Sequence, residues 1–124
     1  MTAVVDASVV LAWLQDESGA DEAEPMLMDG LIGAANWSEV LQKARQHGAP
    51  TGAVARLLTS FGLRVLEVTA DDAERAADLW QAARPLSLGD RLCLALGLRT
   101  GLPVATADDA WGDIDGGPTI IVIR

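Results

Sequence analysis

The chain has 124 residues, with 18 acidic and 9 basic side chains, one cysteine, one histidine and a formal net charge of -9. This length predicts a single domain over residues 1–124 that folds without disulfides or a structural metal. One cysteine excludes a disulfide framework and a cysteine-rich zinc site. A hydrophobic content of 50% excludes a disordered chain. Taken alone, the acidic excess argues against nucleic acid as a partner, because phosphate binding normally uses Lys and Arg.

The apolar runs are too short to span a bilayer, and no basic segment precedes an apolar stretch at the start of the sequence. We therefore expect a cytoplasmic protein with no membrane partner.

The first half of the chain alternates short apolar runs with helical patterns. A strand over Ala3–Val5 precedes a helix from about Val9 to Gln15 and a second helix over Ala20–Met28. The segment Leu31–Ala34 is a weaker strand candidate. Apolar residues at i, i+3, i+4 and i+7 then predict two amphipathic helices. The first carries Trp37, Val40, Leu41 and Ala44, and the second spans Thr51–Phe61.

The second half repeats this alternation. A strand over Leu63–Val68 precedes a helix that begins with a capping box at Thr69–Asp72. The helix over Leu88–Thr100 has almost no polar face, which predicts burial on several sides, with Cys93 as a small buried hydrophobe. A strand over Val104–Thr106, a short helical turn over 107–112 and a strand over Ile120–Ile123 complete the pattern. The alternation predicts an α/β three-layer sandwich with a mostly parallel, about five-stranded sheet.

Acidic residues follow several of these strands. Asp6 comes directly after the first strand, Glu39 shortly after the second candidate, and Asp108 and Asp109 after the strand that precedes them. Asp90 opens the apolar helix. Because right-handed crossovers bring the carboxyl ends of parallel strands to one rim, four carboxylate positions are expected to converge there.

Each acid also has a plainer explanation as a helix cap. The segments Asn36–Glu39, Ser87–Asp90 and Thr106–Asp109 all have capping-box spacing, and acids are favoured at helix N-termini. Glu39 could also pair with Lys43 one turn later. Asp90 fits this explanation less well, because a carboxylate on an apolar helix needs a partner to offset its desolvation. Helix capping explains each acid separately, but it explains less well why all four acids are expected at the same rim of the sheet.

Crowded carboxylates need a counter-charge. Two of them about 4 Å apart repel by roughly 4 kcal/mol at an effective dielectric near 20. Apart from Arg91, which we expect to point elsewhere, no Lys or Arg is spaced to neutralise the cluster. Oxygen ligands select Mg²⁺ or Mn²⁺ over zinc or copper. Such a metal, alone or as a pair, activates water and neutralises phosphoryl charge.

Four segments resemble the PIN-domain nucleases, and most closely the VapC toxins of bacterial and archaeal toxin–antitoxin systems. They are Val-Val-Asp6-Ala-Ser8, Asn-Trp-Ser-Glu39-Val, Leu-Ser-Leu-Gly-Asp90-Arg-Leu-Cys-Leu-Ala-Leu and Thr106-Ala-Asp108-Asp-Ala-Trp111. The resemblance covers the whole chain, and the segment around Asp90 is its most specific part. It implies a PIN-like fold and a Mg²⁺- or Mn²⁺-dependent endoribonuclease that cuts tRNA, rRNA or mRNA.

The resemblance also implies roles for individual residues. Asp6, Glu39, Asp90 and Asp108 match the acidic quartet that holds the metal and the attacking water. The hydroxyl residues Ser8 and Thr106 match positions that support this quartet. The resemblance further implies a homodimer and a cognate VapB antitoxin, whose basic C-terminal segment wraps the toxin and places a basic side chain at the acidic site.

The sequence departs from the family in two ways. Asp109 stands where relatives frequently carry a basic or neutral residue, which leaves open whether Asp108 or Asp109 is the ligand. The chain also has one Lys and no Tyr, so the RNA-contacting surface is expected to consist of a few Arg side chains.

Two other classes of protein stay open. A Mg²⁺-binding phospho-acceptor receiver domain shares the length, acidity and architecture, but it needs paired acids after the first strand and a Lys after the last. Here Asp6 precedes Ala7, and Lys43 lies within a helix. A catalytically silent acidic interaction module is the third class, and it predicts no saturable Mn²⁺ site.

The net charge is compatible with an RNA substrate if the acids hold a metal. Four of the 18 acids, or five with Asp109, are assigned to one site. Bound Mg²⁺ would reverse the local sign of that site toward phosphate. Net acidity therefore excludes tight, metal-free RNA binding driven by bulk charge, and nothing more.

Overall fold

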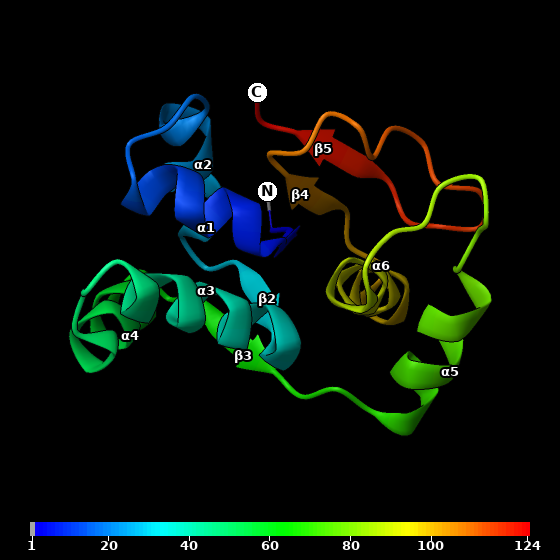
Figure 1. The fold of residues 1–124 in the computed structure, drawn as a ribbon, viewed down its shortest axis with the longest axis horizontal. Helices are drawn as coiled ribbons and strands as arrows, with labels where there is room; N and C mark the ends of the chain where they lie inside the picture. The colour runs from blue at the N-terminus through cyan, green and yellow to red at the C-terminus, as the bar shows by residue number, and fades with distance from the viewer. Residues whose placement is uncertain (1) are drawn as a thin grey trace.

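The computed structural model describes residues 2–124, in which short strands alternate with helices (Figure 1). The strands are β1 (Val4–Val5), β2 (Leu31–Gly33), β3 (Arg64–Leu66), β4 (Val104–Thr106) and β5 (Ile120–Val122). The helices are α1 (Ala7–Leu14), α2 (Ala20–Leu27), α3 (Ala34–Gln46), α4 (Thr51–Ser60), α5 (Ala70–Asp78) and α6 (Leu88–Thr100).

The strands form one parallel sheet in the order β3-β2-β1-β4-β5. Val4 of β1 pairs with Leu31 of β2 on one side and with Val104 of β4 on the other. The helices α1–α4 lie on one side of the sheet, and α5 and α6 lie on the other (Figure 1). The predicted three-layer α/β sandwich with five parallel strands is confirmed.

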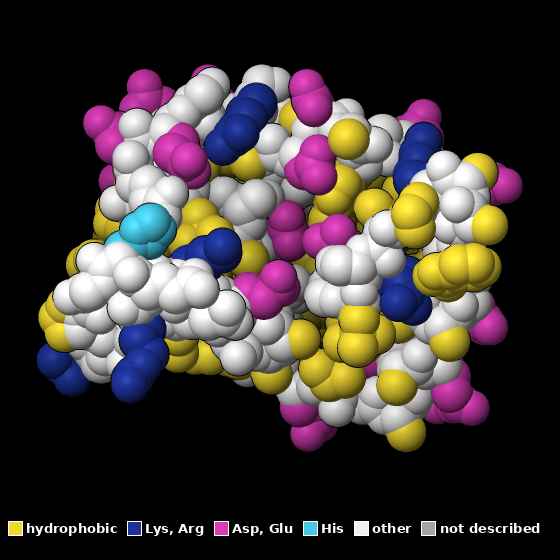
Figure 2. Space-filling view, viewed as in Figure 1, with side chains coloured by type: hydrophobic (Ala, Val, Ile, Leu, Met, Phe, Trp, Pro, Cys, Tyr) yellow, Lys and Arg dark blue, Asp and Glu magenta, His cyan; other side chains and the backbone are white. Residues whose placement is uncertain are grey.

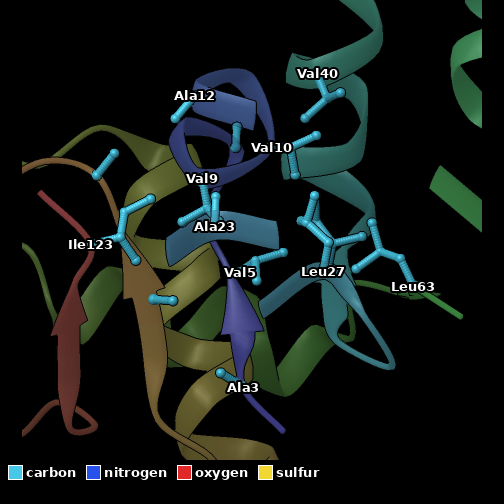
Figure 3. Packing of buried hydrophobic residues seen from close by; sticks show 14 of the residues in the cluster. Ala3, Val5, Val9, Val10, Ala12, Ala23, Leu27, Val40, Leu63 and Ile123 are labelled. Atoms are coloured by element: carbon cyan, nitrogen blue, oxygen red, sulfur yellow. The ribbon is translucent and has the colours of Figure 1, made fainter. Parts of the chain in front are cut away.

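Val4 and Val5 of β1 point to opposite faces of the sheet, so β1 contributes one side chain to each of the two hydrophobic cores. Val5 belongs to the cluster beneath α1, α2 and α3, where Val9 and Leu27 pack (Figure 3), and Val4 belongs to the cluster beneath α6. All three side chains of β4 are buried, as the central place of β1 and β4 in the order requires. The carboxyl ends of β1, β2 and β4 therefore meet between two filled cores.

Helix α6 is buried as its composition predicts. Residues 93–97 are all buried, and Cys93 is a free thiol with no exposed surface. The helix is tied to α5 by Arg99, whose Nε lies 3.0 Å from Asp72 Oδ1. The predicted capping box at Thr69–Asp72 is present at the start of α5. In the same core Trp111 is 1% exposed, whereas Trp80 at the end of α5 is 55% exposed.

The predicted helical turn over 107–112 is wrong. Asp108 N donates to Thr106 Oγ1 at 3.1 Å, and Ala110 N donates to Asp108 Oδ1 at 2.9 Å. Side-chain oxygens thus take up the backbone N–H groups that a helix would use, and only a turn forms. In residues 2–124, no helix is both long and apolar enough to cross a membrane.

Candidate active site

A cavity of about 230 Å³ opens at the rim of the sheet where β1, β2 and β4 end. We call it the carboxylate cavity. Four acids from four parts of the chain line it, and Figure 2 shows acidic side chains gathered in the middle of this face of the molecule. The full lining is Asp6, Ala7, Ser8, Leu11, Glu39, Lys43, Asp90, Asp108 and Trp111.

Asp6 is the deepest of the four acids and is 5% exposed. It directly follows β1 and stands at the N-cap position of α1, but its side chain makes no capping hydrogen bond. Instead, Ser8 Oγ donates to Asp6 Oδ2 at 2.7 Å and Thr106 Oγ1 donates to the same oxygen at 3.2 Å. Burial raises the pKa of Asp6 to about 6, although both hydroxyls act to lower it.

The same hydroxyls also organise the segment that carries Asp108. Ser8 Oγ accepts from Ala107 N at 2.9 Å, and Thr106 Oγ1 accepts from Asp108 N at 3.1 Å. Ser8 and Thr106 therefore connect the end of β1 to the end of β4. The structure brings these two predicted supporting residues into direct contact with Asp6.

Glu39 reaches the cavity from the second turn of α3. Asn36 Nδ2 donates to Glu39 Oε1 at 2.8 Å and to the carbonyl oxygen of Gly89 at 3.2 Å, which joins α3 to the start of α6. The proposed capping box at Asn36–Glu39 is wrong, because the N-cap of α3 is Gly33 and Asn36 lies inside the helix. Burial raises the pKa of Glu39, and the charge of Asp90 adds to this rise.

Asp90 stands in the first turn of α6. Its backbone N donates to Ser87 Oγ at 3.1 Å. Ser87 is therefore the N-cap of the helix, and Asp90 is its third residue, N3. Burial raises the pKa of Asp90, and the neighbouring Asp108 charge contributes. Arg91 points away, as predicted, since it donates to the carbonyl oxygens of Leu86 and Ala76.

Asp108 and Asp109 differ in the cavities that they line. A neighbouring cavity of about 250 Å³ is lined by both acids, together with Ser8, Ala107 and Arg124. Asp108 also lines the carboxylate cavity, and Asp109 does not. The proposed capping box at Thr106–Asp109 is wrong, because no helix follows. The geometry thus favours Asp108 over Asp109 as the fourth member of the site.

No protein cation neutralises these carboxylates within residues 2–124. The two ion pairs in this part of the chain join Arg99 to Asp72 and Arg124 to Glu17, and the alternative pair between Glu39 and Lys43 does not form. The donor set is thus entirely carboxylate oxygen, which suits a hard divalent cation. In this structure, no three His, Cys, Asp or Glu side chains of residues 2–124 lie close enough together to hold an ion.

Two residues of the site are not predicted from the sequence. Its spacing predicts a cap for Asn36, yet Asn36 is 1% exposed and holds Glu39 against α6. The spacing of Lys43 predicts an ion pair with Glu39, yet Lys43 lines the cavity without one. Spacing gave the signal in both cases, because residues three or four positions from Glu39 share its side of the helix.

Known proteins resemble this chain in sequence and in fold. A sequence model of the PIN domain matches residues 3–117. The chain belongs to the PIN-domain family. Its relatives include a VapC ribonuclease of Mycobacterium bovis and ribonuclease VapC42 of Mycobacterium tuberculosis. Each is 31% identical to this chain, and the match covers 90% of the chain and 95% of the relative. These relatives assign the chain to the VapC branch of the family.

Solved structures share the fold. A toxin–antitoxin complex from Klebsiella pneumoniae superposes with a TM-score of 0.77 at 21% identity, over 98% of each chain. DNA-bound VapBC from Salmonella typhimurium gives a TM-score of 0.75 at 19% identity over the whole of both chains. Membership of this family excludes the receiver-domain alternative.

Proposed function

We propose that this VapC-branch protein is the toxin of a type II toxin–antitoxin system and a metal-dependent endoribonuclease that acts in the cytoplasm. The observation that carries the proposal is the carboxylate cavity, which four acids from four parts of the chain line and with which no cation of residues 2–124 forms an ion pair. The relatives support the reaction class, because those in Mycobacterium are named ribonucleases. RNA, as tRNA, rRNA or mRNA, is the proposed substrate.

Asp6, Glu39, Asp90 and Asp108 are the proposed catalytic residues and metal ligands, with Mg²⁺ as the cofactor and Mn²⁺ as a substitute. The cavity of about 230 Å³ leaves room for an ion with several waters, given about 30 Å³ per water. When bound, such an ion neutralises phosphoryl charge and activates a water for phosphodiester hydrolysis.

The protein contributes positioned oxygens and a suitable pKa. Ser8 and Thr106 both donate to Asp6 Oδ2, which leaves Asp6 Oδ1 available to a ligand and holds the carboxylate in one orientation. Asn36 gives Glu39 a comparable anchor. Asp6 must lose its proton to bind a cation, and its pKa of about 6 means that it does so near neutral pH.

Two partners complete the proposal. A cognate VapB antitoxin with a basic C-terminal segment would place a cation among the carboxylates, and the VapBC complexes among the structural neighbours support this partner. The second proposed partner is another copy of the chain in a homodimer.

The proposal is tested by incubating purified protein with total RNA in Mg²⁺ or Mn²⁺, beside the Asp90→Asn variant. Asp90→Asn removes the charge with little change in shape. We expect cleavage by the parent protein alone, and none with EDTA. Equal cleavage by both proteins would point to a contaminating nuclease and refute the assignment. Absence of a saturable Mn²⁺ site would instead favour the silent acidic module.

A further inference from the structure

We propose that Lys43 binds a phosphate group of the RNA strand that enters the carboxylate cavity. This inference rests on the proposed nuclease function and adds to it a substrate-binding residue. It follows from the position of Lys43, from its lack of a partner within residues 2–124 and from the charge of the site.

Lys43 lies one helical turn beyond Glu39 on α3. Residues four positions apart share one side of a helix, and Lys43 accordingly lines the same cavity as the four acids. Lys43 is an exposed residue, so it lines the solvent-facing part of the cavity, which we call its mouth, whereas Asp6 is buried. Figure 2 shows a basic side chain beside the central group of acids.

The side chain of Lys43 forms no hydrogen bond or ion pair with any of residues 2–124. Other cations near the rim are already engaged. Arg91 donates to backbone carbonyls, Arg124 donates to Ser18 O and pairs with Glu17, and Arg84 donates to the carbonyl oxygens of Trp111 and Asp113. Of the described residues that line the cavity, Lys43 is thus the only cation, and it is free to bind an external anion.

An RNA phosphate has the same sign as the four carboxylates, so a strand is repelled wherever these charges are not balanced. A cation at the mouth offsets this repulsion for one phosphate beside the cleaved bond. Lysine suits this task because its ammonium is a compact charge on a flexible stem and can follow a phosphate whose position varies between substrates. His47, the C-cap residue just beyond α3, is instead within hydrogen-bonding distance of Gln15, at 3.4 Å.

The test compares Lys43→Met with a matched control on the same helix. Methionine keeps the length and apolar character of the stem and removes the charge, and Lys43→Arg restores the charge. Arg45→Met is the control, because Arg45 is an exposed cation of α3 that lines a different cavity, together with Trp37 and Leu41. Circular dichroism confirms that each variant is folded.

Binding is measured with a fluorescent random-sequence RNA oligonucleotide in Mg²⁺, in the Asp90→Asn background, so that the probe stays intact. We expect Lys43→Met to raise Kd about fivefold, the effect of one exposed charge pair. The slope of log Kd against log salt should fall by about 0.7, the value for one phosphate on a single strand. Lys43→Arg should restore both quantities, and Arg45→Met should change neither. In the chain that keeps Asp90, Lys43→Met should raise KM and leave kcat within about twofold.

Three outcomes would overturn the inference. The first is an unchanged Kd and salt slope for Lys43→Met, and the second is an equal loss for Arg45→Met, which would indicate bulk charge. The third is a loss of affinity for the cognate antitoxin with RNA binding intact, which would assign Lys43 to protein recognition. Failure of the parent chain to cleave RNA would refute the nuclease function separately, because the binding comparison does not depend on cleavage.

Discussion

Glu39 and Gly89 approach so closely that a β-carbon on Gly89 would lie 2.7 Å from Glu39 Oε1, a distance that real β-carbons essentially never show. Gly89 is the second residue of α6, and its carbonyl oxygen accepts a hydrogen bond from Asn36, which also holds Glu39. The position of the Glu39 carboxylate therefore depends on the absence of a side chain on a different helix.

Gly89→Ala is expected to displace the Glu39 carboxylate from the cavity and to lower the RNA cleavage rate roughly tenfold to a hundredfold, as small misplacements at reacting centres do. Cleavage rate and Mn²⁺ affinity are measured together. Gly52→Ala is the matched control, because Gly52 is the second residue of α4 and its β-carbon would meet only Arg56 Nη1, at 3.4 Å. Equal activity of Gly89→Ala and the parent would show that Glu39 needs no such close approach.

The sequence predicted the rim because strand order follows simple rules. Alternating apolar runs and helical patterns require parallel strands, and parallel strands bring Asp6, Glu39 and Asp108 to one edge. The turn after β4 could not be predicted in this way. Helical and turn conformations compete there for the same N–H groups, and local bonds from Thr106 and Asp108 decide the outcome.

The role of Asn36 was harder to predict, because its second partner is Gly89, 53 residues away. Capping-box spacing places Asn36 beside Glu39, but only the packing of α3 against α6 shows which helix they contact. The choice between Asp108 and Asp109 depends likewise on which way a turn points, and adjacent residues of the same type give no sequence signal for that.

Asp6→Asn should stabilise the metal-free protein at neutral pH. The folded-state pKa of Asp6 is about 6 and its ordinary value is 3.8, so the folded chain binds this proton more tightly than the unfolded chain. Stability is therefore lost as pH rises from about 4 to about 6, and the loss reaches about 3 kcal/mol above that range. Urea unfolding in EDTA should show Asp6→Asn more stable than the parent by up to this amount at about pH 7.5.

The advantage of Asp6→Asn should largely disappear at about pH 4, where Asp6 in the folded parent is protonated and is as neutral as the asparagine. Mn²⁺ should stabilise only the parent. The control is Asp115→Asn, which removes an exposed charge outside the carboxylate cavity and should leave the free energy of unfolding nearly unchanged at both pH values. A parent protein more stable than Asp6→Asn at neutral pH in EDTA would show that Asp6 is not strained by its burial and its neighbours.

Thr106→Val tests whether a hydroxyl tunes the pKa of Asp6. Burial raises that pKa, and the hydrogen bonds from Ser8 and Thr106 lower it, so loss of one donor should raise it further above about 6. Because a cation binds only ionised Asp6, the pH below which Mn²⁺ affinity falls should rise, and the acid limb of the cleavage profile at subsaturating Mn²⁺ should move with it. The shape-conserving Thr100→Val removes a hydroxyl that bonds only within and just beyond α6, and it should leave the profile in place.

A loss of rate in Thr106→Val that is equal at every pH would contradict this effect of Thr106 on the pKa of Asp6. Such a result would mean that the hydroxyl matters only for the backbone it anchors at Asp108 N. Some loss of stability is expected in either case, because Thr106 is fully buried and an unpaired backbone N–H costs about 1–3 kcal/mol.

The pair Asp108→Asn and Asp109→Asn distinguishes two adjacent acids. Asp108 lines the carboxylate cavity and Asp109 does not. Asparagine at 108 retains an oxygen that can accept from Ala110 N, so the turn is preserved while the charge is lost. We therefore expect Asp108→Asn to reduce Mn²⁺-dependent cleavage roughly a hundredfold, and Asp109→Asn to stay within about twofold of the parent. Mn²⁺ titration should show weaker binding for Asp108→Asn alone, and the opposite pattern of activities and affinities would assign the fourth ligand to Asp109.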